Sequence, residues 1–298
     1  MPSPTSFELL SKIFLTVFPL VSIVLIGYLY ARKRSPKMAV ANTLNMDVFI
    51  PALLFSVLAS KSFDLVEYGR LALAAFVVVI GSGILVYPVC KYFGWDVKTF
   101  VPPMMFNNAG NLGLPLAVLA FGEAALPAAV MLFLVENTLH FTLGLYLLDR
   151  NTRMSALAKM PVILASAAGI FWNLSGWPLP EFLALCIGML GDIAIPLMLF
   201  ALGVRMTNID FGQWRIGMAG AVLCPLSGLL IAIPLVMTGL LTPVESGYLI
   251  LFAALPPALL NFMIAEQYQY SPQQVSSIVL LGNFGSLLVI PVVLAFIL

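Results

Sequence analysis

The sequence predicts an all-helical membrane protein with about ten transmembrane helices. Of its 298 residues, 61% are hydrophobic and only 9% are charged, whereas roughly a quarter of the residues in a soluble domain are charged. The apolar residues come in runs of about twenty, the length that a helix needs to cross a hydrocarbon core about 30 Å thick. Runs such as Leu71–Val89 do not alternate apolar with polar residues, so a β-barrel is not expected.

Polar, glycine and proline breaks divide the chain into ten expected spans. They cover residues 7–31, 38–59, 69–93, 98–121, 125–148, 159–178, 181–204, 214–239, 243–267 and 273–297. The sixth span is the least secure, because Trp172, Trp177, Pro178 and Pro180 shorten it. The first segment follows no basic region and has no small-residue cleavage site, so we expect a retained helix rather than a signal peptide.

Lysine and arginine are distributed unevenly between alternate loops, and cytoplasmic loops carry the excess of these residues. Eleven of the fourteen fall on one side: Arg32, Lys33, Arg34, Lys37, Lys91, Lys98, Arg150, Arg153, Lys159, Arg205 and Arg215. Only Lys12, Lys61 and Arg70 fall on the other. We therefore expect a multi-pass protein of the cell (inner) membrane with both termini on the non-cytoplasmic side.

Composition also argues against several classes of function. The net charge of +1 gives no global field for a nucleic-acid partner. The three cysteines, Cys90, Cys186 and Cys224, have no spacing typical of a metal site or a disulfide framework. The sequence shows no His-rich set, Ser/Lys pair or paired-Asp motif of the kind expected in an intramembrane enzyme. It also shows no soluble output domain of the kind expected in a receptor. We expect no catalytic residue, no metal and no cofactor.

Two pairs of segments look like internal repeats. Met46–Phe55 and Gly191–Phe200 share Asp, Ile, Pro, Leu and Phe at identical spacing, and Val101–Asn107 and Leu255–Asn261 share Pro-Pro-x-x-x-Asn. Chance could explain either match alone, but both pairs lie five spans apart.

Because five is odd, the second copy enters the membrane from the opposite side. The sequence therefore predicts two inverted five-helix repeats, residues 1–150 and residues 151–298, an arrangement typical of secondary transporters.

The fourth span contains residues that interrupt a helix. Pro102, Pro103 and Pro115 lack backbone donors, and Gly110 and Gly113 permit unwound geometry. Irregular backbone at membrane depth is tolerated only beside protein or a polar cavity. We expect a broken helix here and a second one in the ninth span, at Pro256, Pro257 and Asn261. Without glycines, the second break is expected to be shorter or shallower.

Two broken helices that meet near the midplane would bring together half-helix N-termini, each with a partial positive charge. The amides of Asn107, Asn108, Asn111 and Asn261 can replace water around a carboxylate without a permanent charge. This pattern predicts an anion site. The alternative is that these prolines and asparagines are kinks satisfied by their neighbours.

Ionisable residues inside spans are costly and are functional candidates by default. Asp47 and Asp192 occupy matching positions four residues before a proline, where each could carry a proton, hold a cation or brace a broken helix. Glu136 and His140 lie one helical turn apart and could share a proton. A neutral histidine bonded inside the bundle is the alternative. Asn137, which Asn283 matches in the tenth span, is expected to steady the core.

The motifs resemble those of the auxin efflux carrier family, which includes bacterial members and the plant PIN proteins. The resemblance rests on Ile50–Phe55, Asn108–Pro115 and the segment from Ala254 to Tyr268, and it covers nearly the whole chain. It implies a fold related to bile-acid sodium symporters and sodium/proton antiporters. By this resemblance, helices 1, 2, 6 and 7 would form a scaffold domain, and helices 3–5 and 8–10 would form a transport domain. Two chains would form a homodimer through their scaffold helices.

Carried over by position, the resemblance makes Gly110, Asn111 and Pro257 the expected substrate contacts. Only Asp149–Lys159 separates the halves, so the long cytoplasmic loop of the larger plant carriers is absent and auxin itself is a doubtful substrate. We expect a secondary transporter that moves a small organic anion, auxin-like or a dicarboxylate, by an elevator-type mechanism. The alternative is a sodium-coupled organic anion symporter; the coupling ion, H⁺ or Na⁺ if any, stays open.

Overall fold

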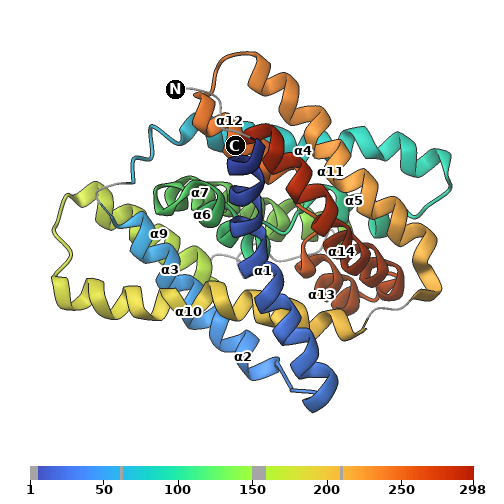
Figure 1. Cartoon of the computed structure of the whole chain (residues 1–298), viewed down its shortest axis with the longest axis horizontal. Coiled ribbons are helices and arrows are strands. Elements are labelled where there is room, and N and C mark those ends of the chain that lie inside the picture. Colours follow the sequence, from blue (N-terminus) through green and yellow to red (C-terminus); the bar gives the residue numbers. More distant parts are fainter. Residues whose placement is uncertain (1–5, 61–62, 150–158, 209–210) are drawn as a thin grey trace. The chain divides into compact units, whose positions relative to one another are not determined.

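The computed structural model describes residues 6–60, 63–149, 159–208 and 211–298, and the regular structure in these residues is helical (Figure 1). The helices are α1 (Ser6–Arg34), α2 (Ala39–Leu44), α3 (Ile50–Leu58), α4 (Gly69–Tyr92), α5 (Val97–Met105), α6 (Leu114–Phe121), α7 (Leu126–Leu139), α8 (Leu145–Leu148), α9 (Pro161–Ser175), α10 (Glu181–Arg205), α11 (Trp214–Met237), α12 (Pro243–Ala253), α13 (Leu259–Tyr268) and α14 (Pro272–Ile297). The chain is therefore an all-α protein, as its hydropathy predicts.

Seven helices of the described chain are long and apolar enough to cross a membrane. They are Phe7–Arg34, Ala39–Leu58, Gly69–Tyr92, Glu123–Leu148, Glu181–Arg205, Trp214–Met237 and Pro272–Ile297. The other three expected spans differ: those over 98–121 and 243–267 are each broken into two short helices, and α9 has only 15 residues. The count of ten crossings stays a prediction.

The chain divides into two compact units. The larger unit comprises Met1–Pro19, Arg70–Asn151 and Asn208–Leu298, and the smaller unit comprises Leu20–Gly69 and Thr152–Thr207. The division falls within α1, next to Pro19. The boundary expected between the two sequence repeats, at residues 150 and 151, lies outside the described residues, as do Lys61, Arg150 and Arg153.

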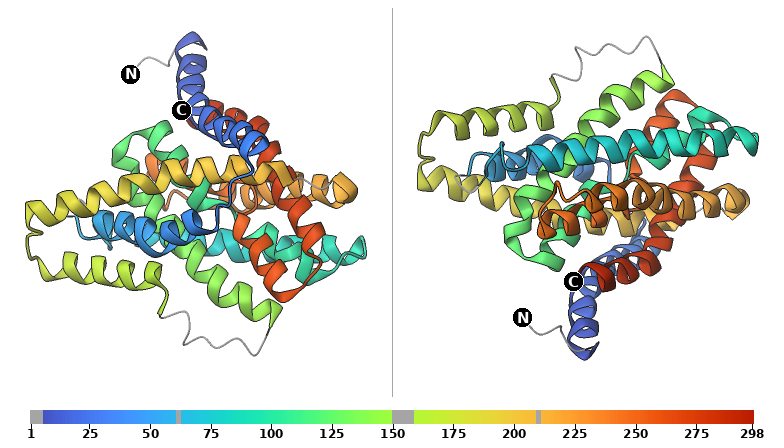
Figure 2. Two further views of the ribbon diagram at one scale, coloured as in Figure 1. Left: turned by 90° about the horizontal axis from the view of Figure 1, so that it is seen from below. Right: turned by 90° about the horizontal axis from the view of Figure 1, so that it is seen from above.

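In the smaller unit, α3, α9 and α10 run side by side (Figure 2). Their backbones approach closely because small residues lie at the contacts. A Cβ atom on Gly191 of α10 would lie 2.9 Å from the Leu53 Cα, and one on Gly203 would collide with the Val24 carbonyl. Small residues permit such packing in a membrane, where burying apolar side chains gains little over lipid.

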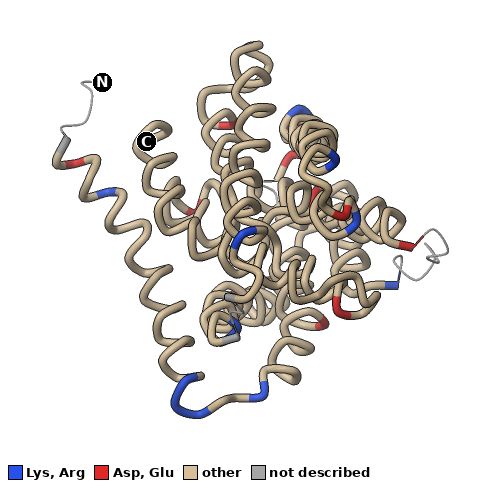
Figure 3. Tube along the Cα trace, turned by 90° about the vertical axis from the view of Figure 1, so that its right-hand side faces the viewer, with Lys and Arg blue, Asp and Glu red and all other residues tan. Residues whose placement is uncertain are grey.

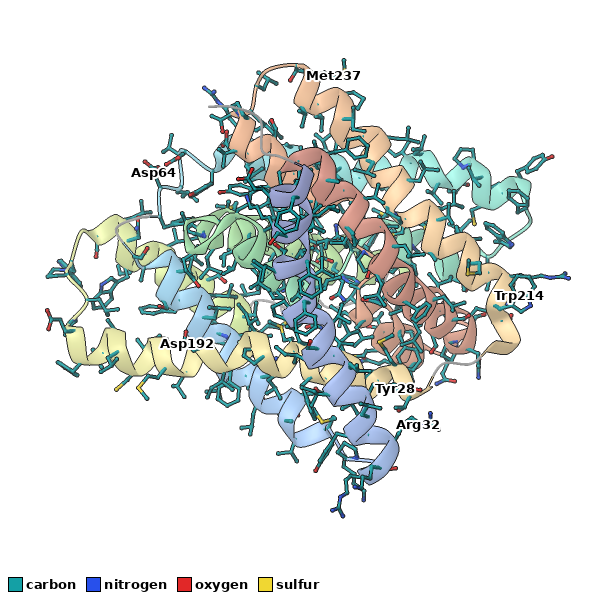
Figure 4. All side chains as sticks on the ribbon, in the orientation of Figure 1. Tyr28, Arg32, Asp64, Asp192, Trp214 and Met237 are labelled. Carbon is teal, nitrogen blue, oxygen red and sulfur yellow. The ribbon has the colours of Figure 1, made fainter. Side chains whose placement is uncertain are left out.

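Charged residues are few along the helices, and a basic cluster lies at the end of α1 (Figure 3). Arg32, Lys33 and Arg34 occupy the last turn of this helix, where cations interact favourably with the helix dipole. The Arg32 guanidinium also lies 5.9 Å from the centroid of the Tyr28 ring (Figure 4). This segment therefore combines a basic end with an aromatic residue, as expected where a span leaves the membrane.

The larger unit contains both broken helices and the helices that pack around them. Its fully buried side chains include Phe100, Phe106, Leu249, Leu255 and Ile278. The α11 and α14 helices pack closely, since a Cβ on Gly217 would lie 2.5 Å from the Ser277 Oγ. These contacts hold the two interrupted segments inside protein, the condition under which unwound backbone is tolerated at membrane depth.

Candidate functional site

The first broken helix is made of α5 and α6. Asp96 caps α5 by accepting hydrogen bonds from the Thr99 backbone N–H (2.9 Å) and hydroxyl (2.8 Å). Two residues after the diproline the helix ends at Met105, and residues 106–108 are unwound. A π-helical turn over Ala109–Gly113 then precedes Pro115. Proline has no N–H to donate to the preceding turn, so an irregular turn before it is expected.

The second broken helix is made of α12 and α13. A capping box fixes its start, with the Thr242 N–H donating to the Glu245 Oε2 at 2.8 Å. The α12 helix ends at Ala253 and α13 begins at Leu259, so residues 254–258 are unwound and contain both Pro256 and Pro257. The expectation of a shorter second break is therefore wrong: it spans five residues, against three in the first, because its prolines lie inside the break.

The two unwound segments pair with each other in antiparallel fashion. The Asn108 N–H donates to the Pro256 carbonyl at 2.7 Å, and the Ala258 N–H donates to the Phe106 carbonyl at 2.9 Å, around a bridge between Asn107 and Pro257. Exchanging residues 106 and 108 with 256 and 258 turns one bond into the other. The broken helices thus cross at a point of local two-fold symmetry, which we call the crossing.

This symmetry corrects the sequence match of the two Pro-Pro-x-x-x-Asn segments. The match aligns Asn107 with Asn261, whereas the hydrogen bonds relate Asn107 to Pro257. Pro102 and Pro103 lie inside α5, before the break, while Pro256 and Pro257 lie within theirs. The shared motif therefore marks two interrupted helices without marking equivalent positions in them.

Amide side chains close the crossing. The Asn107 Nδ2 donates to the Phe252 carbonyl (2.7 Å), and the Asn261 Nδ2 donates to the carbonyls of Phe106 (2.9 Å) and Ala258 (3.0 Å). Each amide thus satisfies a carbonyl of the other broken helix, where the helical bonds stop. Asn107 and Asn261, both predicted to bind substrate, therefore have a structural role in this conformation. Their Oδ1 atoms are buried and have no hydrogen-bond partner in the described structure.

Asn283 of α14 was not among the residues predicted to bind substrate. Its match to Asn137 in the sequence was the one feature that could have indicated a role at the crossing. Its Oδ1 accepts from the Asn108 Nδ2 at 2.7 Å, and its Nδ2 donates to the carbonyls of Pro257 (3.0 Å) and Val279 (2.8 Å). Asn283 therefore contacts both unwound segments at once. It acts as a brace across the crossing.

Asn137 of α7 differs from its sequence counterpart. Its side chain is buried, 5% exposed, and the Nδ2 has no hydrogen-bond partner among the described residues. The neighbouring Glu136 and His140 are also buried, with Oε1 and Nδ1 lying 3.2 Å apart but without the alignment of a hydrogen bond. Asn283 thus braces the crossing from α14, whereas the polar residues of α7 and its following turn carry atoms without hydrogen-bond partners in the described chain.

His140 joins the α7 group to the crossing. Its ring stacks on that of Phe106, with centroids 4.2 Å apart and planes 8° from parallel. The stack depends on Gly144, because a Cβ there would lie 2.9 Å from the Phe106 Cε2 and 3.1 Å from the His140 Cδ2. His140–Gly144 form a π-helical turn, a distortion frequently found at functional sites.

Gly110 and Asn111 begin the second half of the first broken helix. Both are half-buried, and the Asn111 side chain makes no hydrogen bond with the described residues. A Cβ on Gly110 would lie 3.0 Å from the Phe133 Cε2 of α7, so this turn packs against the same helix that carries Glu136. The first N–H groups of a helix have no intrahelical partner, so this end offers donors beside a free amide.

Two small cavities border these elements. One, of about 20 Å³, is lined by Ala109, Gly113, Ala117, Ala129, Leu132, Tyr248, Leu251, Phe252 and Leu255. The other, of about 10 Å³, is lined by Lys98, Pro102, Pro103, His140, Gly144, Leu148, Asn261, Ile264, Ala265 and Val275. Each has room for about one water molecule.

Asp47 and Asp192 lie in the smaller unit, and the residues of the crossing lie in the larger one. Both side chains are exposed. Asp47 occupies a π-helical turn over Asn45–Phe49, ahead of Pro51. Asp192 (Figure 4) lies in the middle of the 25-residue α10. In the described chain no three His, Cys, Asp or Glu side chains group together as metal ligands.

Comparison with known proteins finds membrane transporters. A family described as "Membrane transport protein" matches residues 151–294. A protein of Rhizobium meliloti named "Putative malonate transporter" is 26% identical, with 91% of each chain covered. Uncharacterized transporters of Methanothermobacter thermautotrophicus (29% identical, 93% of this chain and 95% of the relative) and Methanocaldococcus jannaschii (22%, 90% and 93%) also match.

An all-helical chain with seven membrane-length helices, two interrupted helices that cross, and transporter relatives along nearly its whole length is a membrane transport protein. The comparisons support the resemblance to the auxin efflux carrier family that Ile50–Phe55 and Asn108–Pro115 indicate, and the family model itself matches the second half of the chain, residues 151–294.

Proposed function

We propose that the chain is a secondary transporter that moves a small carboxylate anion across the cell membrane by elevator-type alternating access. The observation that carries this proposal is the antiparallel pairing of two interrupted helices within one compact unit. Unwound segments bordered by half-helix ends are typical of transporter binding sites. The relative named for malonate supports a dicarboxylate as the substrate class.

The free donors lie where an anion would bind. The N-terminal turn of the second half-helix carries a partial positive charge and unpaired N–H groups. Gly110 leaves the backbone accessible there, and Asn111 adds an amide with no other hydrogen-bond partner in the described chain. In this proposal Gly110 and Asn111 contact the carboxylate, while Asn107, Asn108, Pro257 and Asn261 shape the site. Breaking the hydrogen bonds of Asn283 to Asn108 and Pro257 would open the binding site.

The two units suit an elevator. The smaller unit, tied together by close glycine contacts, would serve as the scaffold, and the larger unit would carry the substrate. The complete proposal includes ten membrane crossings, two inverted five-helix repeats, both termini on the non-cytoplasmic side and a homodimer. Asp47 and Asp192, exposed on the smaller unit, would support the scaffold or the coupling step.

A sodium-coupled organic anion symporter is the second candidate. Three buried oxygens favour it, because Glu136 Oε1, Asn107 Oδ1 and Asn261 Oδ1 have no hydrogen-bond partner among the described residues. Oxygens beside unwound backbone hold Na⁺ in several transporter folds. Uptake that is unchanged when choline replaces Na⁺ would exclude this candidate.

Counterflow in proteoliposomes tests the main proposal. Vesicles that contain the wild-type protein and unlabelled malonate should accumulate labelled malonate from outside. Asn111→Ala should abolish this accumulation, and Gln267→Ala, which removes an exposed amide from α13, should leave it intact. Equal counterflow by Asn111→Ala and the wild type would remove the proposed binding site. Absence of counterflow in the wild type, across malonate, succinate and acetate, would refute small carboxylates as substrates.

A further inference from the structure

We propose that Glu136 and His140 together bind one proton, taken up through the cavity that Lys98 and His140 line, and that this proton travels with the substrate anion. The inference rests on the proposed function and names its coupling ion. The two side chains are 3% and 2% exposed, and their Oε1 and Nδ1 atoms lie 3.2 Å apart. Buried groups of this kind at membrane depth are costly and typically functional.

Charge balance explains why the pair would hold one proton. With no proton, the pair carries an uncompensated carboxylate in a buried site; with one proton, on either side chain, it has no net charge. The other titratable groups near the pair are few. Lys98 lines the same cavity as His140 and donates to the Tyr270 hydroxyl, and Tyr248 of α12 lines the other cavity together with Leu132 of α7.

The cavity gives the proton a route. The cavity is lined by Lys98, which is exposed, by His140 and by Asn261. The Lys98 Nζ donates to the Leu148 carbonyl (2.8 Å) and the Tyr270 hydroxyl (3.0 Å). His140 Nδ1 and Asn261 Oδ1 have no hydrogen-bond partner in the described chain, so one water in this space would have polar partners on two helices.

The protonation state of the pair can reach the crossing through Phe106. The Phe106 ring stacks on His140, and its carbonyl accepts from the Ala258 N–H and the Asn261 Nδ2. Gly110, at the proposed anion site, packs on Phe133, one turn before Glu136 on α7. An anion bound there adds negative charge near the pair. It therefore favours the protonated state, and by linkage the proton favours the anion to the same extent.

The proton step needs no other reactant. A proton passes from water in the cavity to the pair, stays bound while the anion is bound, and returns to water when the site opens on the opposite side. Anion and proton consequently move in the same direction. An inward proton gradient should drive accumulation of the anion.

His140 is the only histidine in the chain, so isotope-labelled histidine in tag-free protein reports on this residue alone. We expect its infrared or NMR signals to change when the pair takes up its proton as the pH is lowered, and Glu136→Gln to alter that change. Glu266→Gln, which changes an exposed carboxylate on α13, should not. Histidine signals that do not change with pH in the wild type, or that Glu136→Gln leaves unaltered, would overturn the proposal.

Transport separates this inference from the proposed function. An acidic outer pH should drive malonate uptake by the wild type, whereas Glu136→Gln and His140→Gln should lose the driven uptake and keep counterflow exchange, which requires no net proton movement. Driven uptake that survives in both variants would overturn the proton site and leave the transporter intact. If malonate does not move at all, the histidine spectra still decide whether the pair binds a proton.

Discussion

Asn108 donates its backbone N–H to the Pro256 carbonyl over 2.7 Å, joining two segments 148 residues apart in the sequence. This bond and its counterpart from Ala258 to Phe106 form without any side chain. Side-chain amides add to this pairing. Those of Asn107 and Asn261 donate to backbone carbonyls of the other broken helix, and that of Asn283 bonds to Asn108 and Pro257. The crossing is therefore a backbone structure held by amides, and Asn111 is the amide beside it that makes no hydrogen bond with the described residues.

Asn283→Ala should destabilise the protein more than Asn137→Ala. The first change removes bonds to Asn108 and Pro257, at a cost of about 1–2 kcal/mol by the strength of hydrogen bonds inside membrane proteins. The Asn137 Nδ2 has no hydrogen-bond partner in the described chain, so its loss should cost much less. Thermal unfolding in detergent, followed by intrinsic fluorescence, compares the two variants. Equal losses of stability would mean that Asn283 is not the brace.

Gly144→Ala should disturb the Phe106–His140 stack. The added Cβ would lie 2.9 Å from the Phe106 ring, and overpacking of this kind costs about 1–3 kcal/mol. Gly188→Ala on α10 is a matched control, because a Cβ there meets no atom within 4 Å. Alanine is also the better helix former by about 1 kcal/mol. The melting temperature should fall in the first variant and not in the second; an unchanged melting temperature in Gly144→Ala would contradict the stacking geometry.

The proposed topology predicts that the α1–α2 connection faces the cytoplasm. A single cysteine at Lys33, introduced after Cys90, Cys186 and Cys224 have been changed to serine, should react with a membrane-impermeant maleimide only in inside-out vesicles. Basic residues favour this side during insertion, and Lys33 is exposed at the end of α1. Labelling from the outside of intact cells would reverse the topology.

Sequence reasoning reached the broken helices because proline and glycine act through local covalent geometry. Pro102, Pro103 and Pro115 interrupt hydrogen bonding wherever they occur in a helix. The register of the crossing could not be inferred this way, since it depends on which carbonyls meet in three dimensions, and the shared Pro-Pro-x-x-x-Asn motif misaligned Asn107 with Asn261. The motif led to the right helices and the wrong pairing.

Asn137 and Asn283 show the same limit. Their matching positions predicted similar roles, yet Asn283 has hydrogen-bond partners for both amide atoms and Asn137 has an unpaired Nδ2. The difference arises because Asn108 lies opposite Asn283, whereas the symmetry-related position, Ala258, carries no amide. Likewise, the i, i+4 spacing predicted the proximity of Glu136 and His140, but nothing local predicted that Phe106 would stack on the histidine ring.

Equilibrium binding of labelled malonate to the purified protein tests most directly whether the crossing binds a carboxylate. The wild type should bind malonate saturably, and Asn111→Ala should lose binding while its melting temperature stays unchanged, because this amide makes no hydrogen bond with the described residues. Wild-type affinity in Asn111→Ala, together with undiminished counterflow, would contradict the account and move the substrate away from the first turn of the broken helix.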